Sequence, residues 1–369
     1  MTYLDHNATS PPLGDVVAHM AEWMQTCTGN PASLHRAGIQ ARQVIDLART
    51  QVAHLVGAKP SEVIFTSGAT EANVTALTHL ASGGGRLVAI ATEHPAVLAP
   101  LEVLSQEVTL VPVGSDGQVS LAFLERALEG ASGLALMAAN NETGVIHDLD
   151  AIAALVERTG VPWHCDAVQL ARWAAPCLTS GYGRAISSLA LSAHKLGGPQ
   201  GVGALVVRGG VMTPLIRGGG QEGGRRGGTP PVAAIGGFGL AASHAPADGE
   251  SVAACRDRLE RLLLEALPGL VVYGASSPRL PNTSFVSIPA GGEWADGEWL
   301  TIGLAERGVA VSTGAACASG QARPSHVLVA MGYDAAQAQG SLRFSLGPGT
   351  TDADIDAAVA ALQEVLAEG

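Results

Sequence analysis

Short apolar runs alternate with segments of helical periodicity along the first two thirds of the chain. The runs are typical of buried strands and lie at 63–66, 87–91, 134–138, 161–169, 186–191 and 203–207. Between them are segments with a helical pattern, such as 37–56 and 150–158. Strands that alternate with helices predict an α/β fold with a large, doubly wound and mostly parallel sheet.

A second, smaller α/β domain is predicted after the first. The chain has 369 residues, more than one ordinary domain needs. The polar segment 243–250, with its alanines and a proline, has the composition of a domain junction, and helical and strand-like patterns resume after it. We therefore predict a large domain over residues 15–245 and a small domain formed by residues 1–14 and 246–369.

Polar residues follow the predicted strand ends with a regularity that points to one site. Because the carboxyl ends of parallel strands meet at one edge of a sheet, where ligands bind, these residues should converge on one crevice. They are Thr70, His94, Asn141, Asp166, Gln169, His194 and Lys195.

Two of these residues carry the strongest chemical signal. Lys195 ends the sequence Ser192-Ala193-His194-Lys195 after an apolar run. It is either an exposed charge at a strand end or an amine in a partly desolvated pocket, able to form a Schiff base with an aldehyde cofactor. Asp166 is a lone acid at the end of an apolar strand, and it needs a cationic or protonated partner there.

Two glycine-containing segments leave alternatives open. The turn at 67–73 follows a strand and opens a helix, so the amides of Ala69 and Thr70 would bind an anion, unless Ser67 or Thr70 simply caps the helix. The loop at 216–230 contains the dinucleotide-like spacing G-x-G-x-x-G. Glycines and prolines follow instead of the helix that this motif requires. The loop is therefore an ordered arm that reaches a neighbouring surface, or a flexible linker.

Five cysteines are scattered along the chain without a C-x-x-C pair, which predicts a reduced, cytoplasmic protein. Four of them are expected to be buried apolar residues: Cys27, Cys165, Cys177 and Cys255. Cys317 differs, because its loop of small residues, 312–321, cannot bury it well, and an accessible thiol there can act as a nucleophile. Arg343, on a predicted strand, would bind a carboxylate bidentately if it points inward.

Composition excludes two classes of partner. The formal net charge of −12 argues against binding nucleic acid or an anionic membrane surface. The longest charge-free apolar stretch, near 232–245, is interrupted by glycines, a serine and a histidine. It is too broken to span a membrane.

Segments distributed in order over nearly the whole chain resemble the cysteine desulfurases of the NifS/IscS type, which are class V, fold-type I pyridoxal-phosphate-dependent enzymes. The matching segments are 3–9, 29–33, 66–71, 92–94, 140–144, 166–169, 192–195, 228–229, 313–319 and 343–347. The loop that contains Cys317 is similar to that of the long-loop group. Ala193 replaces the usual glycine.

The resemblance implies a role for each matching residue toward pyridoxal 5'-phosphate. Lys195 would carry the cofactor and Asp166 would pair with its pyridinium nitrogen. Gln169 would bind the ring hydroxyl, while His94 would stack on the ring and assist proton transfers. The remaining cofactor-binding residues, several of them around the phosphate, would be Ala69, Thr70, Asn141, Ser192, Ala193 and His194, together with Thr229 from the other subunit of a homodimer.

The resemblance also implies a reaction. Asn141 and Arg343 would hold the carboxylate of L-cysteine, and Cys317 would attack the substrate sulfur. The products would be L-alanine and a persulfide that passes to a protein sulfur acceptor. A selenocysteine lyase, or another class V transaminase in which Cys317 is incidental, would use the same cofactor. A catalytically idle sulfur-trafficking subunit on the same fold is a third possibility.

Overall fold

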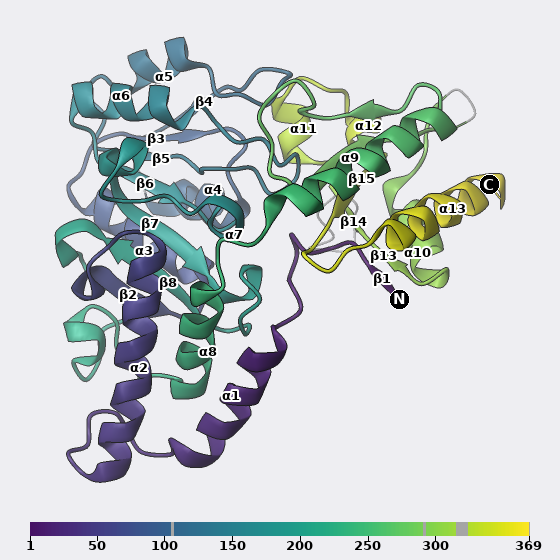
Figure 1. The fold of residues 1–369 in the computed structure, drawn as a ribbon. Coiled ribbons are helices and arrows are strands. Elements are labelled where there is room, and N and C mark those ends of the chain that lie inside the picture. The colour runs from purple at the N-terminus through teal and green to yellow at the C-terminus, as the bar shows by residue number, and fades with distance from the viewer. Residues whose placement is uncertain (105–106, 291–292, 315–323, 369) are drawn as a thin grey trace.

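The computed structural model describes residues 1–104, 107–290, 293–314 and 324–368, and Figure 1 shows its fold. Cys317 lies outside the described residues. The large sheet is on the left of Figure 1, and a smaller sheet with its helices is on the right.

The large sheet has seven strands in the order β2-β8-β7-β6-β5-β3-β4. Neighbouring strands pair in parallel, except that β8 is antiparallel to both β2 and β7. The prediction of a mostly parallel sheet is therefore confirmed. The strands are β2 (Val63–Thr66), β3 (Leu87–Ile90), β4 (Val108–Val111), β5 (Gly133–Ala135), β6 (Trp163–Asp166), β7 (Ile186–Ser192) and β8 (Gly203–Val207).

Alternate residues of these strands face two different sets of helices, as the period of two in a strand requires. On one face, Val63 and Phe65 of β2 join the largest apolar cluster with residues of α2, α5, α6 and α8. On the other face, Ile64 packs with residues of α3, and α3 and α4 cover Leu87 and Ala89 of β3. The helices of this part are α1 (Gly14–Thr26), α2 (Arg36–Leu55), α3 (Ala69–Ser82), α4 (Pro95–Leu104), α5 (Leu121–Leu128), α6 (Leu149–Thr159), α7 (Ala171–Ala174) and α8 (Val232–Ser243), with short 3-10 turns at Pro60–Glu62, Gly181–Ala185, Ala193–Lys195, Arg208–Gly210 and Gln221–Gly224.

The second sheet is antiparallel, with strand order β14-β15-β10-β9. Its apolar cluster includes residues of α9, α10 and α13, and also Leu4 from the start of the chain. The elements are β9 (Val271–Val272), β10 (Thr283–Ser287), β14 (Ser312–Thr313), β15 (Ser341–Ser345), α9 (Gly249–Ala266), α10 (Gly297–Glu306), α11 (His326–Ala330), α12 (Ala335–Gln339) and α13 (Asp352–Glu368). Two further pairs are β1 (Thr2–Tyr3) with β13 (Val309–Ala310) and β11 (Pro289–Ala290) with β12 (Glu293–Trp294).

The first residues of the chain therefore pack on the second sheet, whereas Val16 of α1 belongs to the cluster of the large sheet. The domain boundaries that we predict from the sequence, 15–245 against 1–14 and 246–369, stay a prediction. Among the described helices, none combines the length and the apolar character that crossing a membrane requires.

The glycine-rich loop at 216–230 is held on its own chain by two ion pairs. Arg49 of α2 makes a bidentate contact with Glu222, with both N–O distances at 2.7 Å. Glu222 also accepts a hydrogen bond of 3.1 Å from the amide of Phe65, and Arg226 pairs with Glu71 of α3 at 3.0 Å. The loop is therefore ordered and the alternative of a flexible linker is wrong, while its reach to a neighbouring surface stays a prediction.

The expectation that four cysteines are buried holds only for Cys165. Cys27 and Cys255 are partly exposed, and Cys177 is exposed in the turn after α7. Its sulfur lies 3.3 Å from Oγ1 of Thr179. Hydrogen bonds from Ser180 and Thr179 lower the pKa of the Cys177 thiol to about 7.

We expect the Glu222→Gln substitution to lower the free energy of unfolding by about 3 kcal/mol, because it leaves the largely buried Arg49 guanidinium without its counter-charge. Urea-induced unfolding measures the change. The control is Glu125→Gln, whose partner is Arg158 and whose side chain is 54% exposed. An exposed pair of this kind contributes at most about 1 kcal/mol. Equal effects of the two substitutions would contradict the stabilising role of Glu222.

Candidate active site

Residues at the carboxyl ends of the parallel strands line one cavity of about 700 Å³. Most follow β2, β3, β5, β6 or β7, and Arg343 comes from β15 of the second sheet. The structure brings together these predicted site residues: Ala69, Thr70, His94, Asn141, Asp166, Gln169, Ser192, His194, Lys195 and Arg343. It does not bring in Ala193, which is fully buried, or Thr229, which is exposed outside the cavity lining. Cys317 lies outside the described residues.

Lys195 is held in the cavity by carbonyl groups of the N-terminal segment. Its Nζ donates to the carbonyl of Asn7 and, over 2.6 Å, to the carbonyl of Ala8. Burial, together with the nearby positive charge of Arg343, lowers the pKa of Lys195 from 10.5 to about 8, although Asp5 and Asp166 act in the opposite direction. A substantial fraction of this amine is therefore unprotonated and nucleophilic at mildly alkaline pH. The side chain is not the exposed strand-end charge of the simpler interpretation.

Asp166 ends β6, the central strand of the sheet, and is 9% exposed. Its Oδ2 accepts from Nδ2 of Asn73 at 2.7 Å, and its Oδ1 accepts from the amide of Val168 at 3.0 Å. Both donors are neutral, and no ion pair joins Asp166 to any described residue at salt-bridge distance. Each carboxylate oxygen can accept a further hydrogen bond. The described residues therefore do not supply the cationic or protonated partner that the sequence leads us to expect, and the carboxylate can accept from a bound molecule.

His94 follows β3 and presents a neutral ring to the cavity. Its Nδ1 accepts a hydrogen bond of 3.0 Å from the amide of Ala96, so this nitrogen carries no proton. Burial lowers the pKa of His94, and the opposing effect of Asp166 is smaller. The neutral ring therefore carries its proton on Nε2.

The start of α3 has the features of an anion site. Ala69 and Thr70 open the helix, and the first amides of a helix have no intrahelical acceptor. The N-cap residue is Gly68, which makes no side-chain cap, so the interpretation of this turn as an ordinary Ser67 or Thr70 cap is wrong. Nearby, Nδ1 of His194 lies 3.1 Å from Oγ1 of Thr9. Burial and the charge of Lys195 lower the pKa of His194 to about 4, so its ring is neutral.

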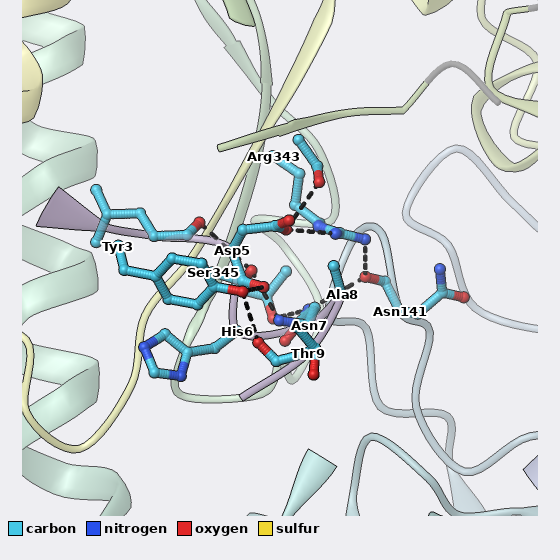
Figure 2. Close-up of polar contacts among 12 residues, drawn as sticks. Tyr3, Asp5, His6, Asn7, Ala8, Thr9, Asn141, Arg343 and Ser345 are labelled. Carbon is cyan, nitrogen blue, oxygen red and sulfur yellow. Dashed lines mark hydrogen bonds and ion pairs between the residues drawn. The ribbon is translucent and has the colours of Figure 1, made fainter. Parts of the chain in front are cut away.

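Arg343 points inward, as one alternative from the sequence requires, but its guanidinium is already engaged. Nη2 donates to Oδ1 of Asp5 at 2.9 Å, and Nη1 donates to the carbonyl of Asn141 at 3.1 Å (Figure 2). Its Nε is buried and has no hydrogen-bond partner among the described residues. A carboxylate that enters the cavity would therefore meet a guanidinium oriented by Asp5.

The N-terminal segment, residues 5–9, is part of the site, although sequence reasoning assigned it no role. Figure 2 shows Asp5 and Asn7 beside Arg343 and Asn141, while Thr9 lies next to Tyr3, whose hydroxyl donates to its carbonyl. Asn7 is 3% exposed, and its Nδ2 donates to the carbonyl of Asn141 at 3.1 Å. Its carbonyl accepts from Nε2 of Gln169 at 3.2 Å. The segment thereby connects the ends of the large sheet to the second sheet.

Sequence reasoning also missed Asn73, which lines the cavity, and His164, which contacts Asn73. The sequence does hold a signal for both. His164 precedes Asp166 by two positions, which places both on the same face of a strand. Asn73 lies three positions after Thr70, which places it on the same side of the helix.

The chain is similar over almost its full length to proteins of known name. The sequence profile of the family described as aminotransferase class-V matches residues 2–358. A cysteine desulfurase of Cereibacter sphaeroides is 42% identical over 365 residues, which is 96% of this chain and 92% of that protein. Among solved structures, a NifS-like protein of Rickettsia africae is 30% identical with a TM-score of 0.89, covering 99% of both chains. The structure of SspA in complex with cysteine is 31% identical with a TM-score of 0.83, covering 95% of this chain and 100% of that one.

The lowered pKa of Lys195 makes its reactivity with pH testable. Lys59, which is exposed, and Lys195 are the only lysines in the sequence, so one digest reports on both. In cofactor-free protein, we expect arylation of Lys195 by trinitrobenzenesulfonate to reach half of its maximal rate near pH 8, because only the unprotonated amine reacts. Peptide mass spectrometry measures the labelling, with Lys59 as the internal reference. A half-maximum near the ordinary value of 10.5 would contradict the desolvation of Lys195.

Proposed function

Because this chain belongs to the class-V aminotransferase family, we propose that it is a pyridoxal 5'-phosphate-dependent cysteine desulfurase, which converts L-cysteine to L-alanine. One observation carries the proposal: the Lys195 amine and the Asp166 carboxylate line the same cavity as the neutral His94 ring. Full-length similarity to proteins named cysteine desulfurase supports it. The cysteine in the SspA structure supports the substrate class.

The residues of the cavity fit pyridoxal phosphate at three points. A carboxylate held only by neutral donors, Asp166, matches a protonated ring nitrogen. An amine with a pKa of about 8, Lys195, matches the aldehyde. The amides at the start of α3, with Ser192 and His194 beside them in the cavity, match the phosphate. When it is bound, this cofactor supplies an electron sink for negative charge at the carbon atoms of the substrate.

The chain's own residues would handle protons and orient the substrate. Lys195 Nζ, with its lowered pKa, can take up and return a proton near neutral pH. His94 lines the cavity with its proton on Nε2, and its ring would stack on the cofactor. Gln169 would contact the ring hydroxyl. Asn141 and Arg343 would hold the substrate carboxylate, with Asp5 fixing the guanidinium in place.

The sulfur step is assigned to Cys317, on the sequence evidence alone. Its thiolate would attack the sulfur of L-cysteine and form a sulfur–sulfur bond. The carbon–sulfur bond of the substrate then breaks, and its electron pair stays on the carbon, which takes a proton to give L-alanine. The persulfide on Cys317 keeps the transferred sulfur until a protein acceptor receives it. No external oxidant is needed, because the electrons balance within this exchange.

We also propose that the protein is a homodimer in the cytoplasm. Exposed apolar side chains on α1 and α2, at Val17, Met24 and Leu47, offer a surface for a second copy. Thr229 is exposed near the end of the loop at 216–230, which the Arg226–Glu71 ion pair holds against α3. From there it can reach the phosphate site of the other subunit. The four described cysteines are free, which favours a reducing compartment.

Two substitutions should separate cofactor binding from sulfur transfer. The purified protein should absorb visible light, and Lys195→Ala should abolish that absorbance because the amine that holds the cofactor is gone. Cys317→Ala should retain the absorbance but lose production of sulfide and alanine from L-cysteine, because the sulfur acceptor is gone. Spectroscopy and product assays under reductant measure both effects.

Sustained sulfide production by Cys317→Ala would contradict the role of this thiol. Rapid release of alanine from selenocysteine but not cysteine would favour a selenocysteine lyase instead. Amino transfer to an oxoacid without sulfide release would favour a transaminase. Normal cofactor binding without turnover of any sulfur amino acid would leave only a sulfur-trafficking role.

A further inference from the structure

A series of hydrogen-bonded, buried polar groups runs from Asp166 into the protein interior, beginning with Asn73, which lines the cavity together with Asp166. Asn73 of α3 is 0% exposed, His164 of β6 is 1% exposed and Ser188 of β7 is 9% exposed. Asn73 Oδ1 lies 2.9 Å from Nε2 of His164, and Nδ1 of His164 lies 2.9 Å from Oγ of Ser188. The chain therefore runs Ser188–His164–Asn73–Asp166 across three elements of the fold.

Strand geometry explains why these groups meet. His164 and Asp166 are two positions apart on β6, so their side chains leave the same face of the sheet. Ser188 is the register partner of His164 on β7 and lies on that face as well. Asn73 approaches from α3, the helix that packs over this face.

The hydrogen bonds in this chain have only one consistent direction. A carboxylate only accepts, so Asn73 must turn its Nδ2 toward Asp166. Its Oδ1 then faces His164, which must donate from Nε2. Burial lowers the pKa of His164 to about 4, so the ring is neutral and its Nδ1 accepts from the Ser188 hydroxyl. Every donor therefore points its positive end toward the carboxylate, and the bonds polarise one another in the same sense.

The hydrogen-bonded polar groups from Ser188 to Asp166 occupy a place in the sheet where apolar side chains would otherwise pack. On the face that α3 and α4 cover, one apolar cluster joins β2, β7 and β8, and a separate one joins β3 and β5. Between them lies β6, which contributes His164 and Asp166 to this face in place of apolar side chains. A hydrophobic residue at 164 would join the two clusters, so packing alone does not account for a histidine there.

A neighbouring acid, Glu93, lies in an environment that disfavours its negative charge. Glu93 is fully buried, and its Oε1 accepts from the amide of Met137 at 2.6 Å, while its Oε2 has no partner among the described residues. Burial and the charge of Asp166 raise the pKa of Glu93 to about 8. Two buried carboxyl groups thus have different environments, and the polar chain favours the negative charge on Asp166 rather than on Glu93.

We propose that Asn73, His164 and Ser188 are positioning residues for Asp166: they hold its carboxylate ionised and aimed into the cavity, so that it keeps the ring nitrogen of the cofactor protonated. The inference rests on the proposed function, because it needs pyridoxal phosphate at Asp166. Only Asn73 contacts the carboxylate, and His164 and Ser188 act on it through Asn73.

The test is the ¹⁵N NMR signal of pyridoxal phosphate labelled at the ring nitrogen and loaded into each variant. Asn73→Leu keeps the number and branching of side-chain heavy atoms, His164→Leu keeps the approximate volume, and both remove the donors. We expect their ring-nitrogen signal to move toward the unprotonated form. We also expect the dissociation constant for the cofactor to rise about tenfold, the effect of losing one hydrogen bond to a charged group. His164→Gln can still donate to Asn73 and should recover the protonated signal. Ser188→Ala should give a smaller shift in the same direction.

The matched control is His147→Leu. His147 is also a buried histidine, 3% exposed, with a pKa lowered to about 4 by burial, and neither ring nitrogen has a partner among the described residues. It lines a different cavity. Its substitution should leave the ring-nitrogen signal and the cofactor affinity as in the wild type. This control separates the effect of losing a buried histidine from the effect of breaking the hydrogen bonds that lead to Asp166.

The possible results distinguish failure of the proposed function from failure of the positioning role alone. A wild-type protein that binds no pyridoxal phosphate would overturn the proposed function, and the inference with it. A wild type with a protonated ring nitrogen, and Asn73→Leu and His164→Leu variants that keep it at unchanged affinity, would overturn only the positioning role. If one of the leucine variants does not fold, the His164→Gln and Ser188→Ala pair decides. A protonated ring-nitrogen signal in His164→Gln together with a partial shift in Ser188→Ala supports the role, and equally large shifts in both variants overturn it.

Discussion

A buried carboxylate at the end of the central strand is the constraint on which the site depends. Asp166 is almost enclosed, and neutral donors from α3 and from the turn after β6 hold it. A charge in that place is costly unless it is paired, and among the described residues it has no salt-bridge partner at close range. Lys195, His94 and the start of α3 line the same cavity as this carboxylate, and in the proposed function all of them serve one cationic cofactor.

The second sheet matters because it closes the cavity from the other side. Arg343 reaches the site from β15, and it is oriented by Asp5 from the segment that precedes the large sheet. The same segment provides the carbonyl groups that hold Lys195. The positive charges of the site are thus placed by the first residues of the chain, which pack on the smaller sheet. The residues proposed to bind the substrate and the cofactor, Arg343 and Lys195, therefore both contact this short segment.

Much of the framework can be predicted from the sequence, because buried strands and their polar ends leave a local signal. The strands β2 and β8 have the bounds that their apolar runs predict, and the residues after the strands do line one cavity. The edge strand β4 is not among the predicted runs, although three of its four residues are apolar, and its positions are mostly half-exposed or exposed. The Asp5–Arg343 and Asn73–Asp166 contacts join residues far apart in the chain. No local sequence pattern predicts these contacts. The roles of the site residues stay predictions.

The measurement that tests the account most directly is peptide mapping after reduction of the holoenzyme with borohydride, which fixes the cofactor on the amine that holds it. With only two lysines in the sequence, the result is unambiguous. The account predicts the reduced cofactor on the peptide that contains Lys195, beside Asp166 in the cavity. Its recovery on Lys59, or its absence from both peptides, would contradict the account.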